Sequence, residues 1–156
     1  MSTAREAITA EGLAALEAEL HELETTAREA MADRIKAARE IGDLKENAEY
    51  HIAKEDQAHL ETKIKRLRER LLAAEVVEAD SAASVLGFGR TAAVRDETTG
   101  TVHTWTVVGA TEADVANGRL SAESPVAAAL LGREVGETVS VQTPRGARSY
   151  RNEKLL

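Results

Sequence analysis

The chain has 156 residues, a length suited to one domain or two small ones. With one Phe, one Trp and two Tyr it excludes a large aromatic-lined pocket, and without cysteine it excludes disulfide frameworks, thiolate metal sites and cysteine nucleophiles. The formal net charge of −7 argues against a protein that coats nucleic acid through bulk electrostatic attraction.

The start of the chain lacks the apolar core of a secretory signal peptide, and no stretch approaches the roughly 18 apolar residues of a membrane span. The lack of cysteine suits a reducing compartment. We therefore expect a soluble protein of the cytoplasm that makes no membrane contact.

Residues 9–77 are predicted to be helical almost throughout, because they contain no proline and are rich in Ala, Glu, Leu, Lys and Arg. Their apolar positions recur at steps of three and four, which is the spacing of a coiled-coil seam. One seam holds Leu13, Leu16, Leu20, Leu23 and Ala27, and the other holds Ala53, Gln57, Leu60, Ile64, Leu67, Leu71 and Ala74. Between Leu23 and Ile35 every step is four, which predicts a stutter that locally unwinds the supercoil.

A break at Gly42 separates the two seams. Folding back into an antiparallel hairpin lets each seam bury against the other. The competing arrangement is a parallel dimer with one continuous rod of about 65 residues, which Gly42 followed by Asp43 disfavours. The sequence therefore predicts a monomer in which residues 1–79 form a coiled-coil hairpin with its tip at residues 42–50.

Residues 80–156 are predicted to form a small α+β domain. In "RTAAVRDETTGTVHTWTVVG", β-branched and polar residues alternate around a turn at "ETTG", which is typical of a β-hairpin. Ser124 as N-cap, Pro125 at the first helical position and Gly132 past the end predict a helix over 125–131. The segment "ETVSVQTPRGARSY" predicts a second hairpin that turns at "TPRG".

Two carboxylates, Asp43 and Glu46, lie three residues apart at the predicted tip. One interpretation is a helix capping box, in which Asp43 accepts backbone N–H groups and Glu46 reaches back to the cap. The other is a partial metal site, since side chains three apart at a helix start can reach one cation together. Because Mg²⁺ prefers six oxygen ligands, two carboxylates supply only part of such a site, and another molecule must supply the rest.

The tip motif "REIGDLKENAEYH" resembles that of the bacterial transcript-cleavage factors of the GreA/GreB family. The resemblance extends to "LxxELxxL" in the first helix and to "VGATEADVANGRLSAESPVAAALLGREVGETVSVQTPRG" in the second half. It implies an α+β protein with an N-terminal antiparallel coiled-coil hairpin, followed by a small FKBP-like domain that docks on the polymerase.

The resemblance also implies a mechanism. Members of this family insert the hairpin through the secondary channel of RNA polymerase and stimulate its Mg²⁺-dependent cleavage of backtracked RNA near the 3′ end. They are not enzymes themselves. By resemblance, Asp43 and Glu46 are the acids that hold a shared Mg²⁺, and Leu44, Asn47 and Tyr50 support the tip. Tyr50 also continues the second seam, so packing is the role that its position favours.

Docking on the polymerase is assigned by the resemblance to Glu123, Ser124 and Pro125, although a helix start explains Ser124 and Pro125 equally well. Two positions depart from the family pattern. Ala128 stands where a basic residue is common, and Asn152 stands where an apolar strand residue is usual. The expected consequences are an altered docking strength and a frayed last strand.

Other charged residues have simpler explanations. Arg39 and Lys45 can approach RNA phosphate, but solvated charges are the favoured interpretation, and the basic run at residues 63–70 is interpreted as a coiled-coil flank. Two alternative functions stay open: a channel-binding factor that modulates or inhibits polymerase without cleavage, and a prolyl isomerase. The isomerase is disfavoured because Phe88, Trp105 and Tyr150 are too few to wall a pocket.

Overall fold

The computed structural model of the protein describes residues 5–43 and 46–156. These residues divide into two compact units, one formed by Leu13–Ala74 and the other by Arg5–Gly12 together with Glu75–Leu156. The compact units divide between residues 74 and 75, and an N-terminal segment joins the second unit, whereas the sequence analysis placed its domain boundary between residues 79 and 80. Within the described residues, no helix is long and apolar enough to cross a membrane.

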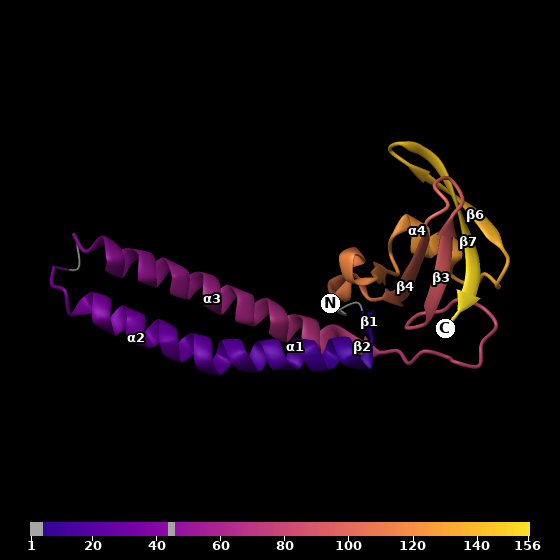
Figure 1. The fold of residues 1–156 in the computed structure, drawn as a ribbon. Coiled ribbons are helices and arrows are strands. Elements are labelled where there is room, and N and C mark those ends of the chain that lie inside the picture. The colour runs from indigo at the N-terminus through magenta and orange to yellow at the C-terminus, as the bar shows by residue number, and fades with distance from the viewer. Residues whose placement is uncertain (1–4, 44–45) are drawn as a thin grey trace. The chain divides into compact units, whose positions relative to one another are not determined.

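The first unit is an antiparallel helical hairpin, as predicted (Figure 1). Helix α1 (Ala10–Glu22), a π-helical turn (Leu23–Ala27) and helix α2 (Arg28–Arg39) form one arm, and α3 (Ala48–Ala73) forms the other. Every residue of the two predicted seams is buried or half-buried. Ala53, Ile64 and Leu67 are at most 5% exposed. The two seams therefore hold the arms together through apolar contact.

The irregularity predicted in the first seam is present as the π-helical turn over Leu23–Ala27. Within it, the hydroxyl of Thr25 donates to the carbonyl oxygen of His21 at 2.7 Å. A π-helical turn contains more residues than an α-helical turn. It therefore accommodates the steps of four and returns the later apolar residues of α2 to the side that meets α3.

Ion pairs cross between the arms of the hairpin. They join Lys63 to Glu19 at 3.4 Å, Arg68 to Glu24 at 2.8 Å, Arg28 to Glu61 at 2.7 Å and Arg34 to Asp56 at 2.7 Å. The hydrogen bond from Arg28 lowers the pKa of Glu61. Because these side chains are solvent-exposed, each pair contributes little to the stability of the hairpin. Lys63 and Arg68 thus flank the coiled coil, as the sequence suggested for the basic run.

The second unit contains a mixed five-stranded sheet in the order β5-β4-β3-β7-β6. Strand β5 is parallel to β4, and the other pairs are antiparallel. The strands are β3 (Thr91–Asp96), β4 (Val102–Val108), β5 (Arg119–Ser121), β6 (Thr138–Thr143) and β7 (Gly146–Leu155). Short 3₁₀ turns, Ala110–Glu112 and Val115–Asn117, join β4 to β5. Both predicted β-hairpins are confirmed, and the mixed α+β class is as expected.

The single α-helix that the structure describes within the sheet domain is α4 (Pro125–Leu130), which packs against β6 and β7. Ser124 caps it, as predicted, by accepting a hydrogen bond from the backbone N–H of Ala127 at 3.2 Å. Leu130 and Val94 are fully buried in the core between helix and sheet. Trp105 and Tyr150 belong to the same core, so they do not wall an open pocket of the kind a prolyl isomerase needs.

A second, two-stranded sheet pairs β1 (Glu6–Ile8) with β2 (Ala74–Val76). The prediction of helix up to residue 77 is therefore wrong at its end. The backbone N–H of Val77 donates to the carbonyl oxygen of Ile8 at 3.0 Å, so this segment pairs with a strand from the start of the chain. A partner so distant in sequence outweighs the local helical preference.

The last strand is not frayed, because β7 stays paired through Leu155. Asn152 is fully buried, and its side-chain amide donates to the carbonyl oxygen of Arg133 at 3.1 Å. Its backbone also bonds to Glu137 and Gly136. The polar residue is thus held by the loop before β6. Its Oδ1 atom is buried and has no hydrogen-bond partner in the described part of the chain.

Candidate functional site at the hairpin turn

The hairpin turns at a glycine whose backbone few other residues could adopt. Gly42 has φ of +134°, which is costly for any residue with a Cβ atom. Beyond the turn, the backbone N–H of Glu46 donates to the carbonyl oxygen of Asp43 at 3.3 Å, and α3 begins at Ala48. Leu44, which the resemblance assigned to tip support, lies outside the described residues.

The N-cap of α3 is Asn47, so the predicted capping box over residues 43–46 is wrong. The Oδ1 atom of Asn47 accepts a hydrogen bond from the backbone N–H of Tyr50 at 3.1 Å. Asp43 and Glu46 therefore precede the helix instead of occupying its first turn. The N-cap of α3 is therefore neither of the two acids.

Asn47 also closes the turn between the two arms. Its Nδ2 atom donates to the carbonyl oxygen of Ala38, near the end of α2, while its Oδ1 atom caps α3. The sequence analysis matched Asn47 to the family motif but missed this double role. Asn is among the preferred N-cap residues, and that preference could have identified it as the start of α3.

Tyr50 packs between side chains of both arms. It is half-buried, and the guanidinium carbon of Arg39 lies 5.9 Å from the centre of its ring. The ring of His51 meets it edge-on at a centroid distance of 5.7 Å. A cation above an aromatic face is attracted by the ring quadrupole. Arg39 thus contacts the aromatic ring that supports the turn.

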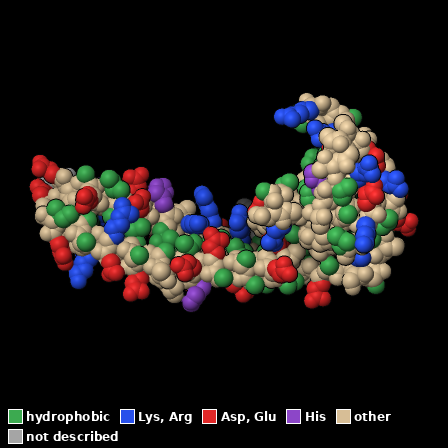
Figure 2. Space-filling model, viewed as in Figure 1, with side chains coloured by type: hydrophobic (Ala, Val, Ile, Leu, Met, Phe, Trp, Pro, Cys, Tyr) green, Lys and Arg blue, Asp and Glu red, His purple; other side chains and the backbone are tan. Residues whose placement is uncertain are grey.

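The two acids predicted to act together lie in the same part of the surface. Asp43 and Glu46 are both exposed, and both line a groove that we call the acidic groove. Its lining residues are Ile41, Asp43, Glu46, Asn47, Ala48 and Glu49. Figure 2 shows acidic side chains gathered at this end of the hairpin.

The donor set of the acidic groove fits part of a magnesium site. Carboxylate oxygens are the hard ligands that Mg²⁺ prefers, and proteins commonly supply one or two of them beside phosphates and water. Across residues 5–43 and 46–156, no three His, Cys, Asp or Glu side chains are grouped so that they could hold a metal ion. The groove thus offers the carboxylate oxygens of Asp43 and Glu46, which are fewer ligands than Mg²⁺ prefers.

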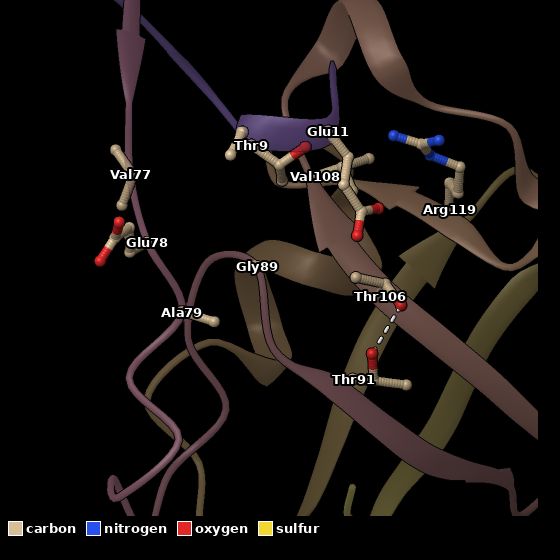
Figure 3. Close-up of a pocket in the computed structure, with 11 residues that line it drawn as sticks. Thr9, Glu11, Val77, Glu78, Ala79, Gly89, Thr91, Thr106, Val108 and Arg119 are labelled. Atoms are coloured by element: carbon tan, nitrogen blue, oxygen red, sulfur yellow. Dashed lines mark hydrogen bonds between the residues drawn. The ribbon is translucent and has the colours of Figure 1, made fainter. Parts of the chain in front are cut away.

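A pocket of the second unit is a weaker candidate (Figure 3). It has a volume of about 390 Å³, and the hydroxyls of Thr91 and Thr106, which are paired residues of β3 and β4, lie 2.7 Å apart on its wall. Arg119 on its wall donates to Glu112 at 3.1 Å, and the same carboxylate accepts the backbone N–H of Thr9 at 3.1 Å. These polar groups bond mainly to one another, which describes a structural contact and not a reactive centre.

The segment assigned to docking lies on the surface of the second unit. Glu123 and Pro125 are exposed. The hydroxyl of Ser124 donates to the carbonyl oxygen of Ser121 at 2.7 Å, besides capping α4. Ser124 therefore shapes the segment from within, and Glu123 and Pro125 are the side chains that a partner can reach.

An acid-tipped helical hairpin followed by a small sheet domain defines a distinct class of two-unit protein, and the comparisons identify that class. Residues 6–76 match the family model "Transcription elongation factor, N-terminal", and residues 81–153 match "Transcription elongation factor, GreA/GreB, C-term". The chain belongs to the GreA/GreB family of transcription elongation factors.

Individual relatives are similar over most of their length. The transcription elongation factor GreA of Chloroflexus aurantiacus is 47% identical over 140 residues, which are 89% of each chain. That of Bacillus subtilis is 43% identical over 139 residues, covering 89% of this chain and 88% of the relative. Among solved structures, the Gfh1 protein of Thermus thermophilus is 27% identical, with 97% of this chain and 99% of that chain covered and a TM-score of 0.43.

Proposed function

We propose that this transcription elongation factor inserts its hairpin into the secondary channel of RNA polymerase and stimulates cleavage of backtracked RNA. The observation that carries the proposal is the pair of exposed carboxylates, Asp43 and Glu46, in one groove at the end of a helical hairpin. Membership of the GreA/GreB family supports RNA polymerase as the partner.

In this mechanism Asp43 and Glu46 contribute oxygen ligands, and the polymerase contributes the remaining ligands. The bond that breaks is a phosphodiester bond of the backtracked RNA, and water supplies the oxygen of the new bond to phosphorus. A Mg²⁺ ion shared between the two proteins would stabilise the attacking water and the leaving oxygen of an in-line displacement. The negative charges of Asp43 and Glu46 would balance the positive charge of the cation. Asn47 fixes the turn that presents these two side chains. The reaction takes place in the polymerase, so this chain acts as an accessory factor.

The remaining contacts follow the same proposal. Glu123 and Pro125 dock on the polymerase, and Ser124 holds the docking segment in shape. The RNA contact is the backtracked 3′ end next to the acidic groove. The free protein is a monomer in the bacterial cytoplasm, where the polymerase works, and Mg²⁺ binds the pair only in the complex.

The test is RNA cleavage in halted, backtracked polymerase complexes, measured across a magnesium titration. Replacing both acids (Asp43→Asn with Glu46→Gln) should slow cleavage at least about 100-fold, because charge stabilisation at the reacting atoms is lost. Binding to polymerase and helix content should be retained, since neither side chain caps α3.

Glu40→Gln is the matched control, because it neutralises an exposed acid next to the turn that does not line the acidic groove. This variant should cleave at the rate of the unmodified protein. Unchanged cleavage in the double variant would refute the metal role of Asp43 and Glu46. A protein that binds polymerase but never stimulates cleavage would instead be a modulator of the channel.

A further inference from the structure

A buried carboxylate of the second unit accepts hydrogen bonds both from the start of the chain and from the sheet domain. The side chain of Glu112, in the 3₁₀ turn after β4, is 4% exposed. Its Oε2 atom accepts the backbone N–H groups of Thr9 and Gly109 at 3.1 and 3.0 Å. Its Oε1 atom accepts the hydroxyl of Thr9, and also the guanidinium of Arg119 at 3.1 Å. Thr9 is therefore held by both oxygens of one buried side chain.

Thr9 connects this carboxylate to the first turn of α1. It directly precedes the helix, and its hydroxyl accepts the backbone N–H of Gly12 at 3.0 Å while it donates to Glu112. A threonine that bonds in this way satisfies one of the unpaired N–H groups at a helix start and acts as an N-cap. The residue that caps α1 is thus itself held by a side chain of the sheet domain.

Gly12 shows how closely the carboxylate approaches the helix. A Cβ atom at this position would collide with the carboxylate group of Glu112. Glycine is unfavourable inside a helix, because it leaves the backbone of the unfolded chain with more freedom to lose. The absence of a side chain at Gly12 leaves the room that Glu112 occupies.

The segment that Glu112 holds leads directly into the hairpin. Arg5–Gly12 belongs to the second unit and Leu13–Ala74 to the first, and α1 continues through this division as one helix over Ala10–Glu22. Backbone hydrogen bonds tie each turn of a helix to the next, so the chain has no flexible linker at this point. A contact that fixes the first turn of α1 therefore fixes the place where the first arm of the hairpin begins.

We propose that Glu112 is a positioning residue for RNA cleavage: it holds the first turn of α1 on the second unit, so that the arm leading to Asp43 and Glu46 starts from a fixed place on the unit that docks. This inference rests on the proposed function and adds a residue of the second unit to it. Glu112 acts through Thr9 and touches no reacting atom. Because small misplacements of catalytic groups slow reactions strongly, loosening this turn should slow cleavage and leave docking unchanged.

The experiment measures polymerase binding and RNA cleavage over the same range of protein concentration. In Glu112→Gln, which keeps the size of the side chain, we expect the cleavage rate at saturation to fall about tenfold. The dissociation constant for the polymerase should stay within about twofold of the unmodified value. Retained binding also shows that the second unit of the variant is folded.

Thr9 tests the same contact from its other end. Thr9→Ala loses the hydroxyl that bonds to Glu112 and should slow cleavage in the same way, whereas Thr9→Ser keeps the hydroxyl and should restore the rate. Combining Thr9→Ala with Glu112→Gln should slow cleavage no more than the stronger single variant, because both remove one contact. Glu11→Gln is the matched control, since it neutralises an exposed acid of the same turn that makes none of these hydrogen bonds, and it should cleave at the unmodified rate.

Amide hydrogen exchange tests the loosening of the turn in the absence of polymerase. The backbone N–H of Gly12 bonds to the hydroxyl that Glu112 holds, so it should exchange faster in Glu112→Gln than in the unmodified protein. In Glu11→Gln its exchange should be unchanged.

The inference is overturned by unchanged exchange at Gly12 in Glu112→Gln, by faster exchange with an unchanged cleavage rate, or by an equal loss of rate in Glu11→Gln. A rise in the dissociation constant that accounts for the whole loss of cleavage overturns it as well. Failure of the proposed function gives a different pattern, because the double variant of Asp43 and Glu46 would then cleave at the unmodified rate.

Discussion

At the residue scale, Asn47 joins both arms of the hairpin through one side chain. Asn47→Ala removes the N-cap of α3 and the bond to Ala38. We expect the free energy of unfolding of the hairpin to fall by about 1–2 kcal/mol, since a lost N-cap alone costs about 1 kcal/mol. Urea unfolding followed by far-UV circular dichroism measures this change.

The variant Asn47→Asp separates the contributions that the two side-chain hydrogen bonds of Asn47 make to stability. Aspartate keeps the oxygen that accepts from Tyr50 but lacks the amide that donates to Ala38. Its stability should lie between those of the unmodified protein and of Asn47→Ala. Equal stability of all three proteins would contradict the role assigned to this side chain.

Asn152 is a buried polar residue whose hydrogen bonds are incomplete. Asn152→Leu removes the unpaired Oδ1 atom, and the carbonyl oxygen of Arg133 keeps its bond from the backbone N–H of Leu86. We therefore expect the free energy of unfolding to rise by about 1 kcal/mol. Thermal unfolding measured by calorimetry tests this expectation.

The opposite change at Asn152 provides the comparison. Asn152→Asp places a carboxylate at a fully buried position, where the present amide donates to the carbonyl oxygen of Arg133, so it should destabilise the protein by about 3 kcal/mol at neutral pH. If the leucine variant were also destabilised by more than about 2 kcal/mol, the bond to Arg133 would outweigh the unpaired oxygen.

At the element scale, the N-terminal segment of the second unit approaches the turn after β4 closely enough to require glycine. A Cβ atom on Gly109 would lie 2.3 Å from the backbone oxygen of Ala7. Glu112 strengthens this contact by accepting the backbone N–H groups of Thr9 and Gly109 at 3.1 and 3.0 Å. The approach positions β1 for pairing with β2.

Gly109→Ala should therefore lower the free energy of unfolding by about 1–3 kcal/mol, because the clash is with backbone and cannot be relieved by a side-chain rotation. Amide hydrogen exchange at Val77, which bonds to Ile8, should become faster. Gly87→Ala is the matched control, since a Cβ atom there meets nothing within 4 Å and should leave the exchange unchanged.

Elements built from local patterns were predictable, and those built from distant pairing were not. The steps of three and four identified the arms of the hairpin, and the turn residues identified both β-hairpins of the sheet. Strands β1 and β2 have three residues each and form only because the two ends of the first half meet. Sequence patterns of that length carry too little periodicity to indicate a strand.

The candidate site was predictable in composition and less so in local geometry. Spacing and resemblance singled out Asp43 and Glu46, and the structure places both in one groove. The spacing also matched a capping box, yet the cap is Asn47, because several polar residues here can each cap a helix.

At the scale of the whole molecule, a buried carboxylate links the stability of the sheet domain to pH. Burial of Asp96 raises its pKa, but hydrogen bonds from the backbone N–H groups of Thr98 and Thr99 and the charge of Arg148 at 3.1 Å outweigh it. The net pKa lies below the ordinary aspartate value. The ionised form therefore stabilises the folded state.

The lowered pKa of Asp96 determines the direction in which the free energy of unfolding changes with pH. The stabilisation is fully present above the pKa of the unfolded state, about 4, and is lost as the pH falls through the lower pKa of the folded state. Trp105, the single tryptophan, is buried in the sheet domain and reports on it by fluorescence. On acidification, the unfolding midpoint that this emission reports should fall, and urea unfolding at a series of pH values measures it.

Asp96→Asn removes the titrating group and tests the assignment. The variant should be less stable at neutral pH, because the pair with Arg148 is lost, and its unfolding midpoint should vary less between pH 5 and pH 3. An acid response equal to that of the unmodified protein would place the responsible group elsewhere.

The two hydrogen bonds made by the side chain of Asn47 bear on which residues of the turn can change over evolution. Since the side chain of Asn47 both caps α3 and bonds to the end of α2, a substitution at Asp43 or Glu46 removes neither of these two hydrogen bonds. The same helical hairpin can thus carry different side chains at its turn. Substitutions at these two positions should therefore change the charge presented at the turn while the hairpin stays folded.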